Sequence, residues 1–444
     1  MVSLNFNNYF TGNKIFAYFY TRKNQIEMIQ EIQSLLENMN RDLPVSINLT
    51  DTGSLSKVTE IADKIIESAS LYVEIEEVEK TISGRKDDYS LIIHLAVKLA
   101  KSKKALQTIK KKIHLSVVFA IYKEHQRILT SGEHPFGEDF LMKKIEQLNW
   151  LFDGKPNFSW DMIVVDDGCP ENSGQIAKKI LKERYDKDNV KVLFLKDAIE
   201  KRVSFVNQIR NTDESRKGGS IEYGMWVASR EEKDNHIIMY TDADLSIHLG
   251  QAGLLIEKII NEDKNAAIGS RREDTSVFIK HGIRNTRGKL FIYLWKRLLS
   301  PINFIVDTQC GFKAFTADNV RKILPGTIEK QFAFDIELLL KTEILKHNSI
   351  SKVAIAGIDS VEASTTTDLQ PYLDMLKMIA NMYYKYLPEN EEAEEFAGFI
   401  ESLNREKWDK LIENIPEAIA EGEPAEFDSF NKIGVKDLQA IIEK

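Results

Sequence analysis

Cysteine is scarce in this chain of 444 residues, with only Cys169 and Cys310, which stand far apart in the sequence. Two distant cysteines provide no disulfide framework and are typical of proteins from a reducing compartment. The start of the chain lacks a basic stretch followed by an apolar run, so we expect no signal peptide. These absences favour a cytoplasmic protein.

Long uncharged apolar runs are missing as well, since no window reaches the roughly 18 residues that a membrane-spanning helix needs. We therefore expect the protein to lie at most on the inner face of a membrane. An excess of positive charge is also absent, because 60 Lys and Arg residues face 68 Asp and Glu residues. The net charge of −8 argues against general nucleic-acid binding, although a local basic surface remains compatible with it.

The distribution of apolar residues divides the chain into three predicted parts. Residues 1–112 have helical periodicity and end in the basic run "KLAKSKKALQTIKKK", so we expect a helical appendage for packing or partner contact. Residues 113–387 form the predicted main domain. Residues 388–444 are acidic and helical, and Pro388, Pro416 and Pro424 divide them into short helices of a C-terminal appendage.

The main domain is predicted to be an open, mostly parallel α/β sheet. Short apolar runs alternate with helical patterns such as "SGQIAKKILKERY", and alternation of this kind indicates parallel strands joined by right-handed crossovers. The runs are "HLSVVFAIY", "WDMIVVDD", "VKVLFL", "HIIMYTD" and "NAAIGS". Ligands of such sheets bind beyond the carboxyl ends of the strands, where this sequence places polar residues.

The stretch "MYTDADLS" places Asp242 and Asp244 one residue apart at the end of a predicted strand. Two carboxylates this close repel each other unless a cation or a bound donor compensates. A divalent metal is the simplest compensation, so both residues are candidate metal ligands.

Two further stretches carry candidate binding residues at the same edge. In "IVVDDGCPENSG", Asp166 and Asp167 could accept hydrogen bonds from a nucleobase edge or a ribose hydroxyl, or could cap the following helix. In "SRKGGSIEYGM", Lys217 and Gly218 precede a helix, where they could hold a diphosphate. The glycines could instead pack the helix against the sheet.

Eight basic residues against two acidic ones lie between Arg271 and Arg297. Arg284 and Arg287 are three residues apart at the start of a predicted helix, so both could face one anion, whereas the alternative is a solvated face. The helix continues with an apolar stripe that contains Trp295. Such a helix suits a lipid-phosphate site or peripheral contact with a membrane, or equally a core helix under a basic rim.

The stretch "QFAFDIELLLK" places Asp335 and Glu337 at the entry of another predicted helix. Carboxylates at this position interact favourably with the helix dipole, so a capping role is one reading. In the other reading, Asp335 faces the acceptor as a base or an orienting group.

Taken in order, five stretches resemble the successive blocks of the inverting glycosyltransferases of family 2, which have the GT-A fold. They are "FAIYKE", "IVVDDGCPENSG", "RKGGSIEYGM", "MYTDADLS" and "GSRR". Two later stretches, "DTQCGFKAF" and "FAFDIELL", look like dolichyl-phosphate glucosyltransferases and other polyprenyl-phosphate glycosyltransferases. The likeness spans roughly residues 115–365.

The resemblance implies a role for each candidate residue in a transfer from a UDP-hexose, with glucose as the expected sugar. Glu124 and Asp167 would bind the uridine, with Asp166 beside them, and Lys217 with Gly218 would bind the diphosphate. Asp242 and Asp244 would hold Mg²⁺ or Mn²⁺. The remaining assignments are Arg271 on phosphate charge, Arg284 and Arg287 on an acceptor phosphate, and Asp335, Asp244 and Arg271 as the catalytic group.

Several positions depart from the family pattern. Ala120 and Lys123 stand where the family commonly has Pro and Asn, and Ser246 replaces the Gln of mannosyl-transferring relatives, so no third metal ligand is assigned. Polyprenyl-phosphate enzymes often carry membrane helices, and their absence favours a second hypothesis, transfer to a soluble glycan or protein hydroxyl. A third hypothesis is a catalytically silent nucleotide-sugar-binding module. The oligomeric state is not predicted.

Overall fold

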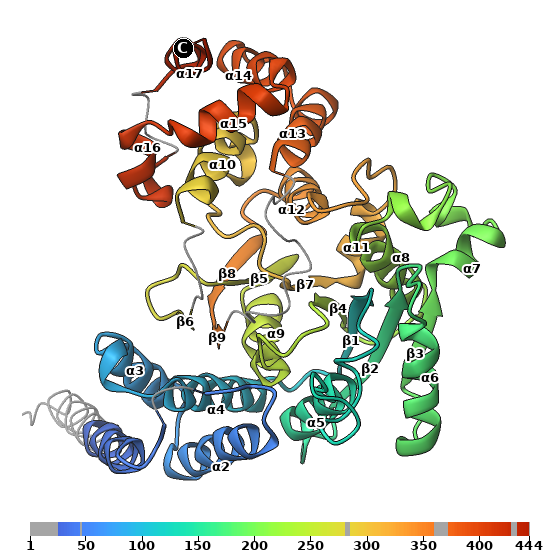
Figure 1. The fold of residues 1–444 in the computed structure, drawn as a ribbon. Helices are drawn as coiled ribbons and strands as arrows, with labels where there is room; N and C mark the ends of the chain where they lie inside the picture. Colours follow the sequence, from blue (N-terminus) through green and yellow to red (C-terminus); the bar gives the residue numbers. More distant parts are fainter. Residues whose placement is uncertain (1–24, 45–46, 280–284, 359–371, 428–432, 444) are drawn as a thin grey trace, which may run out of the picture.

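The computed structural model describes residues 25–44, 47–279, 285–358, 372–427 and 433–443. Its centre is a seven-stranded sheet with helices on both faces (Figure 1), which confirms the predicted open, mostly parallel α/β fold. The strands are β1 (Ile113–Ile121), β2 (Phe158–Asp166), β3 (Val190–Phe194), β4 (His236–Thr241), β5 (Ala266–Ser270), β7 (Phe312–Thr316) and β8 (Ile350–Ala354).

The strand order is β3-β2-β1-β4-β7-β5-β8. Strands β1 to β4 are parallel neighbours, as their alternation with helices predicts. Strand β7 runs antiparallel between β4 and β5. A small second sheet pairs β6 (Val277–Ile279) with β9 (Ala356–Ile358).

The N-terminal part is helical, as expected. Residues 25–40 form a helix, and three more follow: α2 (Thr52–Ser68), α3 (Tyr72–Ser83) and α4 (Leu91–Thr108). Helix α4 is buried along most of its length because it packs between α2, α3 and α9. These helices share one hydrophobic core with a face of the sheet that includes Val117 and Phe119.

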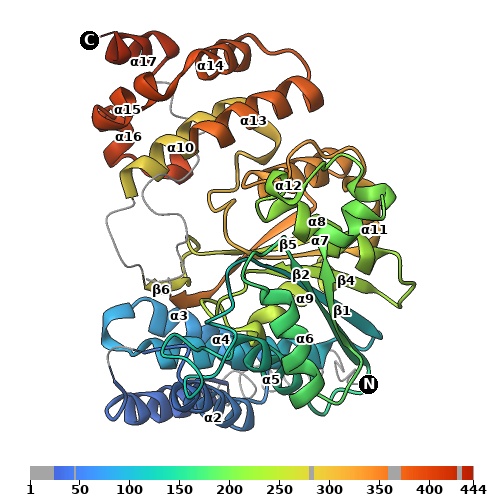
Figure 2. The same cartoon turned by 45° about the vertical axis from the view of Figure 1, so that its right-hand side comes forward.

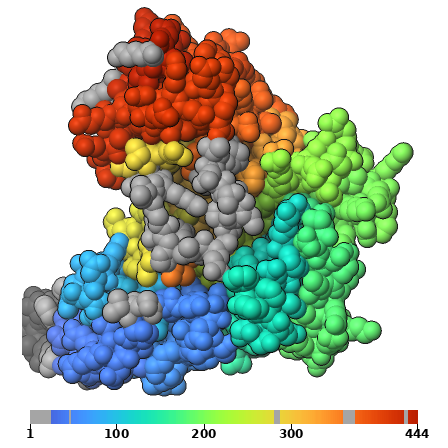
Figure 3. Space-filling model, viewed as in Figure 1, coloured from blue at the N-terminus to red at the C-terminus, as the bar shows by residue number. Residues whose placement is uncertain are grey.

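The opposite face of the sheet has its own core, to which Val118 contributes from the same strand. This reversal between neighbouring residues is the alternation that a strand buried on both faces requires. The C-terminal helices belong to this second core. Figures 1 and 2 accordingly show the N-terminal helices (blue) and the C-terminal helices (red) far apart, and Figure 3 shows them at opposite ends of one surface.

The remaining helices lie between the strands or follow the sheet. Those between strands are α5 (Phe140–Phe152), α6 (Ser173–Arg184), α7 (Leu195–Glu200), α8 (Gly218–Ser229), α9 (Ala252–Asn261), α10 (Asn285–Leu298), α11 (Ala317–Ile323) and α12 (Phe334–Leu345). Those after the sheet are α13 (Tyr372–Tyr386), α14 (Glu391–Ser402), α15 (Arg405–Glu413), α16 (Glu417–Glu421) and α17 (Val435–Ile442). The predicted breaks at Pro388 and Pro416 fall between helices, whereas Pro424 begins a short 3-10 helix, Pro424–Glu426, between α16 and α17.

Within the described residues, no helix combines the length and the apolar composition that crossing a bilayer would take.

Candidate active site

Candidate residues at the ends of β2 and β4 lie at the carboxyl edge of the sheet, on either side of β1. Asp166 is the last residue of β2 and pairs in register with Ile121, the last residue of β1. Asp242 follows directly after β4, which is the other neighbour of β1. The sequence prediction that these side chains share one edge is therefore confirmed.

Lys217 connects two of the predicted carboxylates. Its Nζ donates to Oδ1 of Asp242, and its backbone N–H donates to Oδ2 of Asp167 at 2.7 Å. The other carboxylate oxygen of Asp167 accepts from the Ser220 hydroxyl at 2.6 Å. Lys217 has a φ of 87°, a backbone conformation that non-glycine residues adopt at a cost and that is found preferentially at functional sites. The amino end of α8 is thus fixed beside the metal-ligand candidates.

Both members of the Lys217–Asp242 pair are held in their charged forms. Burial opposes the charge on Lys217, but the carboxylates of Asp242, Asp335 and Asp244 raise its pKa above the usual value. Burial likewise opposes ionisation of Asp242, whereas Lys217 and other lysines lower its pKa. The two side chains are 35% and 39% exposed, so a ligand can reach both.

Asp244 is placed by two contacts of its own loop and of α5. Its Oδ1 accepts from the Ser246 backbone N–H at 3.1 Å, and its carbonyl oxygen accepts from the Nζ of Lys144 at 2.7 Å. Lys144 is fully buried, and burial lowers its pKa to about 8. The sequence analysis missed Lys144, although a signal was present, because this lysine follows Phe140 and precedes Leu148 at helical spacing on an apolar face.

Asp166 makes hydrogen bonds of the kind expected if it caps the following helix, one of the two roles predicted for it. Its two carboxylate oxygens accept from the backbone N–H groups of Cys169 (2.9 Å) and Gly174 (2.7 Å), in the turn and at the start of α6. Burial raises its pKa despite these hydrogen bonds. Its neighbour Asp167 instead faces α8, so the two adjacent carboxylates serve different elements.

Glu124 lies in the loop after β1, close enough to Asp244 for their charges to interact. One of its oxygens accepts from Arg127 at 3.0 Å. Burial raises the pKa of Glu124 to about 7, although Arg127 opposes the shift. Arg127 also binds Glu138 through two hydrogen bonds of 2.9 and 3.0 Å, which fixes the guanidinium.

Gly218 and Gly219 are used for close packing. A Cβ atom on Gly218 would lie 2.5 Å from the carbonyl oxygen of Gln331, and the N–H of Gly219 donates to the carbonyl of Lys330 at 2.8 Å. The glycine pair is therefore used for packing, but against the 330–331 backbone and not, as the second prediction had it, against the sheet. Diphosphate binding by Gly218 stays a prediction.

Arg271 is held by Asp307, the first residue of the "DTQCGFKAF" stretch. The guanidinium donates to both carboxylate oxygens at 2.8 and 2.6 Å, and the Arg271 backbone N–H donates to Oδ2 at 2.8 Å. Burial opposes the charge on Asp307, but Arg271 lowers its pKa to about 2. The Arg271 side chain is still 27% exposed, so it can face a ligand while it is paired.

The same stretch also contacts Asp242. A Cβ on Gly311 would lie only 2.4 Å from both carboxylate oxygens of Asp242, so only glycine leaves room for this carboxylate. Within five residues, the stretch therefore positions Arg271 from one end and accommodates Asp242 at the other.

Asp335 lies at the start of α12, as predicted, and is buried behind the site. Its Oδ1 accepts from the Nζ of Lys313 at 2.7 Å and from the Tyr240 hydroxyl. Tyr240 belongs to β4, two residues before Asp242, and its pKa is raised by burial and by Asp335. The sequence analysis missed both partners, since they come from strands β4 and β7.

Residues 144–317 match the family model described as "Glycosyl transferase family 2". This region therefore belongs to glycosyltransferase family 2. The matched region contains Asp166, Asp167, Lys217, Asp242, Asp244 and Arg271, whereas Glu124 and Asp335 lie outside it. The predicted family and the GT-A fold class are thereby confirmed, and so is the expectation of an enzyme.

Curated relatives of this chain carry the name dolichyl-phosphate β-glucosyltransferase. The protein from Drosophila melanogaster is 29% identical over 283 residues, 62% of this chain and 76% of the relative. The protein from Dictyostelium discoideum is 24% identical over 327 residues, 72% and 84% of the two chains. The human protein is 28% identical over 282 residues, again 62% and 76%.

Solved structures similar to this chain include glucosyl-3-phosphoglycerate synthase from Mycobacterium tuberculosis, in complex with Mn²⁺, uridine diphosphate and glucosyl-3-phosphoglycerate. The identity is 14%, the TM-score is 0.41, and the match covers 66% of this chain and 85% of that one.

Of the two predicted acceptor arginines, the structure describes only Arg287. Arg284 lies outside the described residues, whereas Arg287 is exposed in the first turn of α10. The apolar stripe of this helix is buried, with Trp295 at 0% exposure, against helices α13, α14 and α16. Two predictions were open for the helix that contains Trp295, a membrane-contacting helix and a core helix. The structure shows the core helix. An acceptor role for both arginines stays a prediction.

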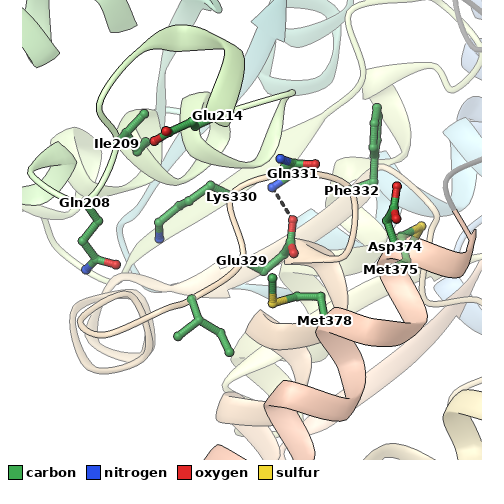
Figure 4. Close-up of a pocket in the computed structure, with 11 residues that line it drawn as sticks. Gln208, Ile209, Glu214, Glu329, Lys330, Gln331, Phe332, Asp374, Met375 and Met378 are labelled. Carbon is green, nitrogen blue, oxygen red and sulfur yellow. Dashed lines mark hydrogen bonds between the residues drawn. The ribbon is translucent and has the colours of Figure 1, made fainter. Parts of the chain in front are cut away.

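A separate pocket of about 250 Å³ lies beside Lys330 and Gln331, whose backbone contacts Gly218 (Figure 4). Three parts of the chain line it: residues 208–214, residues 328–332 and helix α13. Its wall includes the carboxylates of Glu214, Glu329 and Asp374, and burial raises the pKa of Glu329 to about 7. The one lysine of the lining, Lys330, is paired with the buried Glu222 at 2.5 Å. This lining is therefore acidic.

Proposed function

We propose that this protein transfers a hexose, with glucose as the first candidate, from a UDP-sugar to polyprenyl phosphate or another phosphorylated acceptor, with inversion at the anomeric carbon. The observation that carries the proposal is the ion pair between Lys217 and Asp242, with Asp167 on the same lysine. It brings a cation and several carboxylates together at the sheet edge where nucleotides bind in folds of this kind. The names of the curated relatives support glucose and a lipid phosphate.

The donor would bind across this edge. Glu124 and Asp167 would accept hydrogen bonds from the uridine; Asp167 retains lone pairs for this, because each carboxylate oxygen can accept two hydrogen bonds. Asp166 would support them through the turn that it caps. Lys217, at the amino end of α8, and Arg271 would face the diphosphate, where cations and helix amino ends stabilise negative charge.

The residues at this edge fit a divalent cation. Asp242 and Asp244 offer carboxylate oxygens from one loop, the donors that Mg²⁺ and Mn²⁺ prefer. Among the described residues no three His, Cys, Asp or Glu side chains are grouped to hold a metal by themselves. A site of two carboxylates leaves coordination positions for diphosphate oxygens. When bound there, Mg²⁺ or Mn²⁺ would offset charge on the leaving diphosphate.

The chain's own residues would carry out the rest of the chemistry. An acceptor oxygen would attack the anomeric carbon on the face opposite the diphosphate, and the bond from that carbon to the diphosphate oxygen would break. Lys217 and Arg271 would stabilise the departing charge, and their carboxylate partners keep both cations in place before substrate arrives. Displacement from the opposite face inverts the configuration.

The role of Asp335 would depend on the acceptor. A phosphate acceptor is already anionic and needs no strong base, and Asp335 would then orient the site through Lys313 and Tyr240. A hydroxyl acceptor must lose a proton, and the carboxylate oxygen of Asp335 that does not face Lys313 would receive it. Helix α12 would hold Asp335 in place with either acceptor.

One observation favours the second acceptor class, a soluble glycan or protein hydroxyl. The pocket of Figure 4 is lined by Glu329 and Phe332, six and three residues before Asp335 in the sequence, and its carboxylates would repel an anionic acceptor. Carboxylates and amides bind hydroxyl groups well, and Phe332 offers an apolar ring face. A soluble glycan or protein hydroxyl is therefore the alternative acceptor.

The deciding experiment is incubation of the purified protein with radiolabelled UDP-glucose, Mn²⁺ and polyprenyl phosphate. Label in the organic phase is expected. Label that appears only on an added soluble glycan or protein would select the alternative acceptor. Absence of both transfer and hydrolysis with a panel of nucleotide sugars would indicate a catalytically silent binding module and overturn the proposal.

A further inference from the structure

A buried charged cluster lies outside the active site, between the N-terminal helices. Lys98 of α4 is 2% exposed and Glu79 of α3 is 3% exposed, and the two form an ion pair. Lys101, one turn further along α4, binds the second oxygen of Glu79 at 2.6 Å. Removing such charges from water costs free energy, and packing alone would be served as well by apolar side chains of similar volume. The cluster therefore calls for a reason beyond packing.

The Nζ of Lys98 also donates to the hydroxyl of Thr275 at 3.2 Å, across 177 residues of sequence. Thr275 belongs to the loop between β5 and β6, four residues after Arg271. The loop is closed by its own contacts, since the hydroxyl of Ser276 donates to the carbonyl of Ser270 at 2.7 Å. Arg271 and Thr275 therefore lie on one short, closed loop.

Helix α4 also packs against the segment that follows Asp244. A Cβ on Gly250 would lie 2.7 Å from a Leu99 side-chain carbon, and one on Gly253 would lie 2.5 Å from the Ser102 hydroxyl. The backbone of this segment approaches α4 as closely as glycine permits. The helix thus contacts two parts of the chain that lead to the active site.

We propose that Lys98 is a positioning residue: its ammonium, fixed by Glu79, holds Thr275 and thereby the loop from which Arg271 faces the donor diphosphate. The inference rests on the proposed function and deepens it. The N-terminal helices would then help to position active-site residues, in addition to packing against the sheet. An ammonium has three donors, so Lys98 can serve the carboxylate and the hydroxyl together. Its role is to limit the positions that Arg271 can adopt.

The test compares three variants of the full-length chain. Thr275→Val removes the hydroxyl and keeps the ion pair, whereas Lys98→Met removes the charge and the hydrogen bond. Lys101→Met is the matched control, because Lys101 binds the same glutamate and contacts Glu79, Glu76 and the Tyr72 ring, all on α3. Hydrogen exchange of the peptide covering 270–279 is measured first, without any ligand. We expect faster exchange in the Thr275 and Lys98 variants, and wild-type exchange in the Lys101 variant.

The second readout is uridine diphosphate binding with Mn²⁺, together with thermal unfolding. Thr275→Val should weaken binding by roughly fivefold, within the range for residues that act through packed neighbours, at an unchanged melting temperature. Unchanged exchange and unchanged binding in Thr275→Val would overturn the inference, as would an equal effect of Lys101→Met. If wild-type protein binds no nucleotide while exchange responds as expected, the proposed function fails but the loop contact stands.

Discussion

The ammonium of Lys217 meets the carboxylate of Asp242 at the point where α8 begins and β4 ends. The pair places opposite charges where a nucleoside diphosphate and its cation would need them. Both side chains are more than a third exposed. A diphosphate can therefore take the place of Asp242 beside Lys217, and a divalent ion can take the place of Lys217 beside Asp242. The pair would then act as a stand-in for the bound donor.

Asp244→Asn should abolish transfer and leave the fold intact, because the substitution removes charge at nearly constant volume. We expect turnover to fall by roughly two to three orders of magnitude, the loss that follows removal of one electrostatic stabiliser of a transition state. Turnover is measured with saturating UDP-glucose and Mn²⁺. The exposed Asp234→Asn is the control, and turnover equal to wild type in Asp244→Asn would contradict the metal assignment.

Gly311→Ala should impair transfer through Asp242 alone. The added Cβ would lie 2.4 Å from the carboxylate oxygens, so Asp242 must turn away and lose Lys217. The matched control is Gly398→Ala in helix α14, where a Cβ meets nothing within 4 Å. The control should raise the free energy of unfolding by about 0.5–1 kcal/mol. Both variants are compared by Mn²⁺-dependent nucleotide binding and by denaturant unfolding; wild-type binding in Gly311→Ala would refute the argument.

Replacing Arg284 and Arg287 together by Gln should raise the KM for polyprenyl phosphate by roughly tenfold or more, since charge-assisted hydrogen bonds would be lost. The KM for UDP-glucose should stay at its wild-type value. Initial rates with each substrate varied in turn separate the two. An equal loss of donor affinity would place these arginines on the donor.

Glu124 should make stability depend on pH. Burial raises its pKa from 4.5 to about 7, so the folded state keeps a proton that the unfolded state has lost between these values. Stability relative to Glu124→Gln should therefore fall as the pH rises from about 4.5 to 7, by up to about 3 kcal/mol. Urea unfolding at a series of pH values measures this difference. The exposed Glu183→Gln is the control, and a difference that does not vary with pH would mean that Glu124 is well solvated.

The sequence was sufficient to predict the elements and the edge of the sheet on which the candidate residues lie. Short apolar runs placed β1 to β5, and parallel topology then brought Asp166, Asp167 and Asp242 to one edge. The antiparallel insertion of β7 could not be foreseen, because a five-residue apolar run carries no signal of its direction or its neighbours.

For a related reason, the sequence did not predict which distant side chains form hydrogen bonds with the candidate residues. Lys144 lies 100 residues from Asp244, and Asp307 lies 36 residues from Arg271. Periodicity tells which face of an element is buried, but it does not tell which side chain of another element will meet it. Asp166, Lys217 and Asp335 were each found together with the helix start beside them, since a helix entry is a local signal.

The continuous core beneath the sheet has a practical consequence for fragments of this protein. A shortened expression product that begins at residue 113 would strip away α4 and leave the apolar sides of α9 and of the β6–β9 pair facing water. Such a product should collect in inclusion bodies. Crystallisation and assay work is therefore better begun with the N-terminal helices retained.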